Sequence, residues 1–377
     1  MPDTLPIAEA LPIAPALPGG LDTPCLVIDL DIVERNAHRM AEAVAARGIS
    51  LRPHVKTHKS VALARMQLEA GAVGITVGTL GEAEVMAKGG INDILLAYPL
   101  WAEGRKAARL RALHERDDLT FVVGVDSVAG ARSLAAAVAG STKSLRVLIE
   151  LDPQYHRTGV DPAAAGSLAA QLRDIGLDVV GVFTHGGHAY RGPDAVGSAA
   201  ADEVGAIAAA ADSLRAAGIE PQILSAGSTP TALSVATAPV NEVRPGTYLI
   251  NDRIQVHMGS CAAVDVAVAV AATVVSDSVP GKFVIDAGAK SLTKDMAPYL
   301  TGYGFLPAYP DGVLERLTDY HGEIRLPDGA HGPRLGDVVA VVPNHVCPVI
   351  DLFDSFVATR SGEVIGRWPV DARGRSG

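Results

Sequence analysis

Three basic side chains stand at or near the ends of short apolar runs, where residues of these types could perform chemistry. They are Lys56, Arg157 and His185. A lysine that is desolvated at the end of a strand has a lowered pKa, and its amine can then form a Schiff base with a carbonyl group. The alternative for Lys56 is a solvated loop lysine, which is what we expect of Lys59. Lys56 is therefore the first candidate catalytic residue.

Two turns of small residues, 227–229 (Gly-Ser-Thr) and 246–247 (Gly-Thr), indicate a phosphate site. Small residues let backbone N–H groups approach a phosphate, and the last two strand–helix loops of a barrel commonly form such a site. Each turn alone could be an ordinary tight turn. Together with Lys56 they indicate pyridoxal phosphate, with Arg157 against its ring, where a fixed cation discourages protonation of the ring nitrogen. The alternative for Arg157 is a salt-bridged surface arginine.

A histidine and a cysteine near the C-terminus could bind a metal. His345 and Cys347 are two residues apart in a run that predicts a strand, and side chains two apart on a strand face the same side. An imidazole with a thiolate favours zinc or another borderline transition ion. Two ligands leave coordination positions open, which suits a catalytic site better than a structural one. The alternative is that both side chains only pack, as we expect of Cys25 and Cys261, the other two cysteines.

The elements that must position these residues alternate between strand and helix. The predicted strands are Leu51–Lys56, Val73–Thr79, Asp93–Pro99, Leu119–Asp126, Leu145–Asp152, Val179–His185, Gln222–Gly227 and Val243–Ile250. The predicted helical stretches between them include 59–70, 102–115, 161–175 and 196–217. Eight alternations over about 200 residues predict an α/β fold, a (β/α)8 TIM barrel with functional residues at the C-terminal strand ends. A doubly wound open sheet is the alternative.

Changes in composition along the chain predict three regions. Residues 1–22 form a Pro/Ala-rich arm, in which the density of prolines opposes both helix and sheet. Residues 30–255 form the barrel that binds pyridoxal phosphate. Beyond it, Val/Ala strands and Asp/Gly turns predict a mostly β domain of residues 256–377 that carries the metal site, and the strand at 23–29 is expected to join it.

Composition and charge exclude several classes of protein. The 377 residues carry 32 Lys plus Arg against 42 Asp plus Glu, a formal net charge of -10. An acidic chain with no basic run is unsuited to binding nucleic acid. No Lys or Arg precedes Arg35, so we expect no export signal, and no apolar stretch is long enough to span a membrane. Three widely spaced cysteines fit a reducing compartment, so a cytoplasmic protein is expected.

A series of short sequence words stands in order between Thr23 and the C-terminus. They are Arg-Pro-His-Val-Lys-Thr-His-Lys (52–59), Gly-Glu-Ala-Glu (81–84), Asp-Ile-Leu-Leu-Ala-Tyr-Pro (93–99), His-Arg-Thr-Gly-Val (156–160), His-Gly-Gly-His-Ala-Tyr (185–190), Gly-Ser-Thr-Pro (227–230), Pro-Gly-Thr-Tyr (245–248), Asp-Ala-Gly (286–288), His-Gly (321–322) and His-Val-Cys (345–347). The series resembles the fold-type III pyridoxal-phosphate enzymes, whose barrel is alanine racemase-like. Within them the chain looks most like the group of D-threonine aldolase and eukaryotic-type D-serine dehydratase. The resemblance covers about nine-tenths of the chain.

The resemblance implies a role for each candidate residue. Lys56 is the lysine that binds the cofactor, Arg157 faces the cofactor nitrogen, and His345 with Cys347 binds a divalent metal. The residues implied in holding the phosphate or the ring are Tyr190, Gly227, Ser228, Thr229, Gly246, Thr247 and Tyr248. Zinc or manganese is the expected metal, with magnesium and cobalt as further options. A homodimer is also implied, with the active site between the barrel of one subunit and the β domain of its neighbour.

The resemblance leaves two reactions open, both on a D-β-hydroxy-α-amino acid. An aldolase breaks the Cα–Cβ bond after a base takes the hydroxyl proton, whereas a dehydratase loses the hydroxyl after a base, most simply Lys56, takes the Cα proton. Cys347 as a metal ligand resembles the dehydratase branch. His188, three residues after His185, could be the base that retro-aldol cleavage needs. The alternative is that His188 is an exposed loop histidine without a role in the reaction. We expect retro-aldol cleavage of D-threonine-type substrates to glycine and an aldehyde, with a D-serine or D-3-hydroxyaspartate dehydratase as the alternative.

Two functions of other classes stay open. A pyridoxal-phosphate carrier without turnover would need no metal, so the pair of His345 and Cys347 argues against it. A cofactor-free metal hydrolase would need several carboxylate or histidine ligands at the strand ends, where Lys56 and two phosphate-type turns stand instead. Visible cofactor absorbance of the purified protein would exclude the hydrolase.

Overall fold

The computed structural model describes residues 16–377, and the chain divides into two compact units. The barrel unit contains His38–Lys56, Val61–Gly246 and Gly374–Gly377. Of the described residues, the β unit contains 16–37 together with Thr57–Ser60 and Thr247–Arg373. The chain therefore passes from one unit to the other several times, once directly after Lys56.

Eight parallel strands form the barrel unit. They are β2 (Ser50–Leu51), β3 (Ile75–Val77), β4 (Asp93–Leu96), β5 (Thr120–Val125), β6 (Arg146–Leu151), β7 (Asp178–Thr184), β8 (Ile223–Ala226) and β9 (Glu242–Val243). They pair in the order β2-β9-β8-β7-β6-β5-β4-β3. The ring closes between β2 and β3, where the Val73 N–H donates to the Leu51 carbonyl (2.9 Å) and the Thr76 N–H to the Pro53 carbonyl (2.8 Å). The predicted α/β barrel is confirmed.

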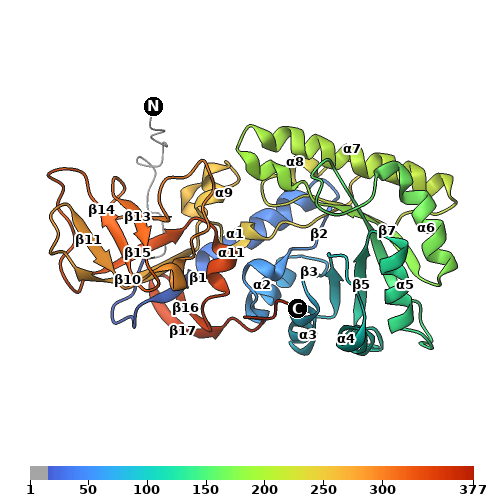
Figure 1. The fold of residues 1–377 in the computed structure, drawn as a ribbon, viewed down its shortest axis with the longest axis horizontal. Coiled ribbons are helices and arrows are strands. Elements are labelled where there is room, and N and C mark those ends of the chain that lie inside the picture. Colours follow the sequence, from blue (N-terminus) through green and yellow to red (C-terminus); the bar gives the residue numbers. More distant parts are fainter. Residues whose placement is uncertain (1–15) are drawn as a thin grey trace. The chain divides into compact units, whose positions relative to one another are not determined.

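Helices follow most of these strands and lie outside the ring (Figure 1). They are α2 (Val61–Glu69), α3 (Leu80–Lys88), α4 (Gly104–His114), α5 (Val128–Ala137), α6 (Ala165–Asp174), α7 (Ala195–Ala216) and α8 (Ala232–Val235). The buried face of α7 repeats every three or four residues, as an amphipathic helix requires. Its buried side chains are alanine, isoleucine and leucine, with Glu203 as the charged exception.

Two predicted strands are much shorter than expected, because short 3-10 helices lie at several strand ends. These helices are η2 (Val55–Thr57), η4 (Gly187–Arg191) and η5 (Thr247–Leu249). The predicted strand 51–56 ends at Leu51, and the predicted strand 243–250 ends at Val243. Pro245 and Gly246 explain the second difference, since proline lacks the N–H of a ladder and glycine weakens a strand.

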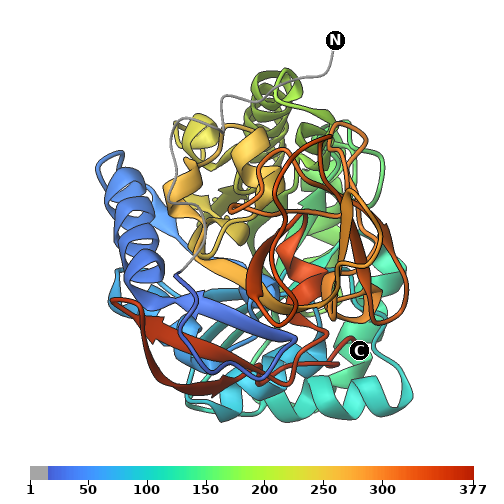
Figure 2. The same ribbon diagram turned by 90° about the vertical axis from the view of Figure 1, so that its left-hand side faces the viewer.

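One nine-stranded sheet forms the centre of the β unit. Its strands are β1 (Cys25–Asp29), β10 (Val268–Ser276), β11 (Lys282–Ile285), β12 (Gly304–Phe305), β13 (Val313–Leu317), β14 (Gly322–Arg325), β15 (Val338–Pro343), β16 (Ser355–Arg360) and β17 (Glu363–Pro369). Their order is β13-β14-β11-β10-β1-β16-β17, and β15 pairs with β10 and β12. Figure 2 looks toward these strands. The α-helices that begin in this unit are α1 (Leu30–Ala45), α9 (Arg253–His257), α10 (Ala289–Leu292) and α11 (Val346–Ile350).

The predicted N-terminal arm, residues 1–22, lies mostly outside the described residues. Of its described part, Leu17 and Leu21 pack on a buried cluster in the β unit. That cluster comprises Cys25, Val27, Ala271 and Val357. The end of the arm therefore contributes apolar contacts to this core. From residue 16 onward, the structure contains no helix with both the length and the hydropathy of a membrane span.

Cys25 and Cys261, the two cysteines predicted to be buried, differ in solvent exposure. Cys25 lies inside β1, and burial raises the pKa of its thiol. Cys261 is only half-buried. It lies in the irregular segment between α9 and β10, next to the exposed Ala262.

Candidate functional site

Lys56 lies in η2, just beyond the C-terminal end of β2, and its side chain is exposed, so the desolvation expected of this lysine is not observed. His54 and His185 belong to the same end of the barrel. Burial, assisted by the charge of Lys56, lowers the pKa of both imidazoles well below the usual 6.5. Lys59 is not the solvated lysine that was predicted, because it is 7% exposed and its Nζ lies 3.1 Å from the Asp351 carboxylate.

Three cations act on this end of the barrel. Burial contributes most to the low pKa of His185, and the charges of Lys56, Arg157 and Arg244 add to it. A cluster of positive charge at strand ends suits a dianionic ligand such as a phosphate ester. The residues present therefore fit pyridoxal phosphate, whose aldehyde also requires a nearby lysine.

Arg244 is the cation that sequence reasoning missed. It is buried just after β9, and its guanidinium donates to the Ser225 Oγ (2.6 Å) and to the Thr184 carbonyl (2.5 Å). Burial lowers the pKa of this guanidinium. Its place before Pro245 and Gly246, at the start of a predicted phosphate turn, is the signal that could have identified it.

The loop after β6 carries Arg157. Leu151 and Val160 form a parallel bridge that closes the loop. Between them Gly159 has φ +100°, and a Cβ there would lie 2.5 Å from the Leu151 carbonyl carbon, so the closed loop requires glycine. The Arg157 side chain is nearly half-exposed, and its Nη2 lies 3.6 Å from the Glu150 Oε1. This ion pair is long, so Glu150 does not fix the guanidinium in place.

His185 and His188 both lie near Tyr155, with ring centroids 5.9 and 6.2 Å from the tyrosine ring. His188 is buried, so its alternative as an exposed loop histidine is wrong. Its Nε2 lies 3.2 Å from the Asp202 Oδ2, and its buried Nδ1 has no hydrogen-bond partner in residues 16–377. Since the carboxylate can only accept, Nε2 is the nitrogen that donates in this contact. Tyr190, also in η4, is half-buried.

The turn of Gly227, Ser228 and Thr229 joins β8 to α8 and is buried. The Gly227 N–H donates to the Glu203 Oε1 (2.9 Å), and the Ser228 N–H donates to the Thr231 Oγ1 (2.9 Å). Both amides are therefore used within the protein. A phosphate at this turn would have to bind other groups of the turn.

The second small-residue turn is helical. Gly246 is half-buried at the end of a barrel-unit segment, whereas Thr247 and Tyr248 lie in η5 of the β unit and are buried. The Thr247 carbonyl accepts the N–H groups of Ile250 (3.2 Å) and Asn251 (2.7 Å). Gly246, Thr247 and Tyr248 are thus consecutive residues at the point where the chain passes from the barrel unit to the β unit.

His345 and Cys347 lie at the start of α11 in the β unit. His345 is the N-cap residue and Cys347 is in the first turn. The predicted strand is wrong, because Pro348 fits the first turn of a helix, where its missing N–H costs no hydrogen bond. The two side chains nevertheless interact. Burial lowers the pKa of the His345 imidazole, but Cys347, Asp252 and Asp295 outweigh burial and raise it to about 10.

Neighbouring carboxylates orient this pair. The Asp295 Oδ2 lies 2.5 Å from the His345 Nδ1, and the buried Asp252 accepts the Val346 N–H (2.9 Å). A carboxylate on Nδ1 leaves Nε2 as the nitrogen for a metal, as is typical of zinc-bound histidines. With the Cys347 thiolate it fits zinc or a similar ion that takes its other ligands from water or substrate. No group of three or more His, Cys, Asp or Glu in the described chain is placed to hold a metal.

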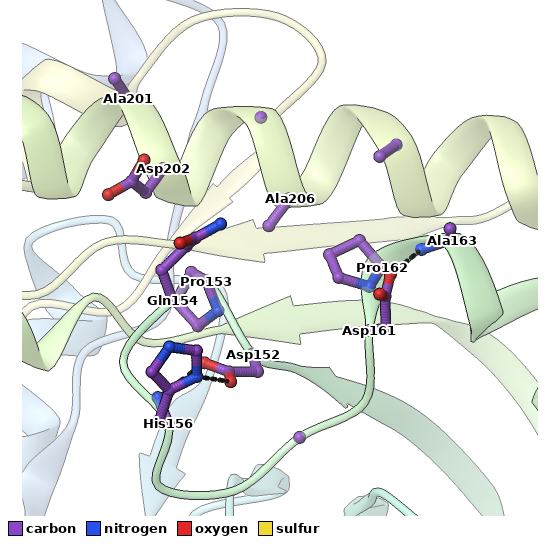
Figure 3. Close-up of a pocket in the computed structure, with 13 residues that line it drawn as sticks. Asp152, Pro153, Gln154, His156, Asp161, Pro162, Ala163, Ala201, Asp202 and Ala206 are labelled. Carbon is purple, nitrogen blue, oxygen red and sulfur yellow. Dashed lines mark hydrogen bonds and ion pairs between the residues drawn. The ribbon is translucent and has the colours of Figure 1, made fainter.

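A groove of about 500 Å³ lies in the barrel unit between the loop after β6 and α7 (Figure 3). Asp152 and His156 form an ion pair in the loop, with Oδ2 and Nδ1 2.7 Å apart. Asp202 projects from α7 into the lining. The carboxylate that holds His188 therefore also borders an open groove, so solvent reaches it.

Comparison with protein families gives two matches. Residues 28–253 match the alanine racemase, N-terminal domain, and residues 267–359 match a serine dehydratase domain. A D-threo-3-hydroxyaspartate dehydratase from a Delftia species is 37% identical over 370 residues, which cover 92% of this chain and 97% of the relative. A D-threonine aldolase from an Arthrobacter species is 32% identical over 381 residues, 97% of each chain. A 3-hydroxy-D-aspartate aldolase from Paracoccus denitrificans is 31% identical, covering 96% of this chain and 95% of the relative.

Solved structures of the same kinds of enzyme are similar to this chain in fold. The D-threo-3-hydroxyaspartate dehydratase from Delftia superposes with a TM-score of 0.86 at 36% identity, over 93% of this chain and 97% of that one. A D-threonine aldolase from Filomicrobium marinum gives 0.85 at 31% identity, over 96% and 98%. Two solved mutants of the dehydratase replace a histidine and a cysteine two positions apart by alanine, and the cysteine mutant is in a metal-free form.

Proposed function

Because the chain belongs to the alanine racemase-like, fold-type III family of pyridoxal-phosphate enzymes, we propose that it is a pyridoxal-phosphate- and divalent-metal-dependent lyase of D-β-hydroxy-α-amino acids. The relatives that span the whole chain are aldolases and dehydratases of such substrates by name. The barrel unit supports the proposal through an exposed lysine among cations. The β unit supports it through the pair of His345 and Cys347.

The residues proposed to hold the cofactor lie at the strand ends. Lys56 would bond to its aldehyde carbon, the turns 227–229 and 246–248 together with Tyr190 would hold its phosphate and ring, and Arg157 would face its ring nitrogen. When bound, pyridoxal phosphate accepts the electron pair released at the substrate Cα. A guanidinium at Arg157 would disfavour protonation of the ring nitrogen, and an unprotonated ring is a weaker electron sink than a protonated one.

The proposed metal ligands are the His345 Nε2 and the Cys347 Sγ. A metal bound there supplies a Lewis acid for the β-hydroxyl group of the substrate. Asp295 keeps the Nδ1 of His345 occupied, and Asp252 holds the backbone between the two ligands. These contacts fix the His345 imidazole and the backbone at the start of α11.

We infer β-elimination as the reaction, so that the substrate is converted to a 2-oxo acid and ammonia. The single observation that carries this choice is the pair of His345 and Cys347, whose residue types and spacing match those replaced in the two dehydratase mutants. In this reaction Lys56 takes the proton from Cα, and the β-hydroxyl group leaves with a proton as water. The exposed position of Lys56 leaves its amine accessible for that transfer.

Retro-aldol cleavage, the reaction expected from the sequence, stays the second candidate. The observation that favours it is His188, whose buried Nδ1 has no partner within the described residues while Asp202 holds its Nε2. Such an imidazole can take the proton of the β-hydroxyl group as the Cα–Cβ bond breaks. The products are then glycine and an aldehyde.

Product analysis separates the two reactions. The purified chain, with pyridoxal phosphate and Zn²⁺ or Mn²⁺, is incubated with D-threo-3-hydroxyaspartate, D-threonine or D-serine, and with the L-isomers as controls. β-Elimination gives ammonia with oxaloacetate, 2-oxobutanoate or pyruvate respectively. Retro-aldol cleavage would instead give glycine, together with glyoxylate from D-threo-3-hydroxyaspartate or acetaldehyde from D-threonine. No product from any D-isomer, with cofactor and metal bound, would contradict both.

A further inference from the structure

Helix α7 carries a buried carboxylate that neither candidate reaction uses. Glu203 has no exposed surface, and it lies on a helix face otherwise made of alanine, isoleucine and leucine. Burying a charged group is costly unless hydrogen bonds compensate for the lost water. The contacts of Glu203 should therefore show what this carboxylate does.

Glu203 joins the loops that follow two neighbouring strands. Its Oε1 accepts the N–H of Gly186 (3.0 Å), after β7, and the N–H of Gly227 (2.9 Å), after β8. Burial raises the pKa of this carboxyl group, while Thr231, the two amides and the Arg244 charge oppose the rise. One oxygen thus fixes the spacing of two loops.

Glycine is required at both contacts. A Cβ on Gly186 would lie 2.8 Å from the Glu203 Cδ. Gly227 has φ +85°, and a Cβ there would lie 2.9 Å from the Val235 Cγ2. Side chains other than glycine would push the loops away from the carboxylate or strain their backbone. The two glycines and the carboxylate therefore form one unit, the Glu203 clamp.

We propose that Glu203 is a positioning residue that sets the phosphate turn 227–229 against the loop of His185 and His188. The inference rests on the proposed pyridoxal-phosphate function. The Gly227 amide opens the turn, so its anchor determines where the other turn groups lie. Because the same oxygen also holds Gly186, removing it would loosen the turn and the histidine loop together.

The test compares cofactors with and without a phosphate. Pyridoxal phosphate and pyridoxal are titrated into the native chain and into Glu203→Leu, Glu203→Gln and Ser213→Ala, with visible absorbance as the readout. Glu203→Leu should weaken pyridoxal phosphate binding by about tenfold or more, the value of one hydrogen bond to a charged group. Pyridoxal binding should change by less than about threefold, within the spread of measured single contacts. Glu203→Gln keeps a carbonyl oxygen as acceptor and should restore the preference for the phosphate.

Ser213→Ala is the matched control on the same helix. The Ser213 Oγ accepts the N–H of Gly166 (3.0 Å), so the variant also loses a contact from α7 to a glycine amide, but this glycine belongs to α6 and not to the loop after β7 or β8. Its preference for pyridoxal phosphate should equal that of the native chain. Equal losses for both ligands in Glu203→Leu would overturn the positioning role. No binding by the native chain would instead overturn the proposed function.

A measurement on the native chain keeps the proposal testable if Glu203→Leu does not fold. The amides of Gly186 and Gly227 should exchange hydrogen as slowly as those inside β7, because both are buried and bonded to the carboxylate. Exchange as fast as that of exposed loop amides would overturn the clamp.

Discussion

His54 and His185 lie among cations, and their neutral state follows from that position. Burial first, and then the charges of Lys56 and Arg244, disfavour the protonated imidazole. Two protonated histidines here would add positive charge beside the amine of Lys56. Neutral rings keep that amine accessible to a carbonyl carbon and leave imidazole nitrogens able to accept a proton.

The same shifts predict how stability depends on pH. An unfolded histidine has a pKa of about 6.5, and the folded values lie below it. Below about pH 6.5 the unfolded chain therefore binds more protons than the folded one, and the free energy of unfolding falls as the pH decreases toward the folded pKa. Each imidazole should contribute up to about 1.4 kcal/mol per pH unit in this window.

Urea unfolding of the cofactor-free protein at pH 7.5 and 5.5 measures this effect. His54→Gln and His185→Gln should each show a smaller difference between the two pH values than the native chain. His156→Gln is the control, because its exposed imidazole is paired with Asp152 on the loop surface. If both variants lost as much stability as the native chain, the buried histidines would not be the cause.

At the scale of elements, the eight barrel strands were predictable because short apolar runs, most of which end in Pro, Asp, His or Gly, alternate with helical stretches. The short length of β9 was not predictable, because the apolar residues that follow it continue past Pro245 into η5. His345 and Cys347 were assigned to a strand for a similar reason, as the run Val346–Ile350 is apolar and β-branched. Their partners depend on residues distant in sequence, so no local pattern identifies them.

The loop after β6 gives a prediction that belongs to this scale. Gly159→Ala should lower the free energy of unfolding by roughly 3 kcal/mol, because it combines a positive φ with a clash against the β6 backbone. Gly176→Ala is the matched control, since its φ of +93° is similar and nothing lies within 4 Å of the added Cβ. It should cost only about 1 kcal/mol.

Urea unfolding compares the two glycine variants, and Arg157 provides a second readout. If the closed loop holds Arg157 near the cofactor ring, Gly159→Ala should also alter the visible spectrum of the bound cofactor. Equal stability losses in the two alanine variants would show that the backbone conformation, and not the contact with Leu151, makes glycine necessary at residue 159.

At the scale of the whole molecule, the candidate groups are divided between two units. Lys56, Arg157 and the turn 227–229 belong to the barrel unit, whereas His345 and Cys347 belong to the β unit, as do Thr247 and Tyr248 of the second turn. Each unit has its own core and its own buried contacts around its candidate residues. Because Lys56 and the pair of His345 and Cys347 belong to different units, we expect that removing Lys56 leaves metal binding intact and that removing Cys347 leaves cofactor binding intact.

Four alanine variants test that separation. Lys56→Ala should lose the visible absorbance of the bound cofactor and keep the metal, because the Schiff-base amine is gone while α11 is unchanged. Cys347→Ala should lose the metal and keep the absorbance. Lys59→Ala and Cys261→Ala should keep both the metal and the absorbance of the cofactor. Lys59→Ala should also lower the free energy of unfolding, because the Asp351 carboxylate loses the ammonium group at 3.1 Å. Metal content by mass spectrometry and absorbance spectra of the purified variants are the measurements. Loss of cofactor and metal together in Lys56→Ala or Cys347→Ala would mean that the cofactor and the metal do not bind independently. Activity of metal-free Cys347→Ala would mean that the reaction does not need the metal.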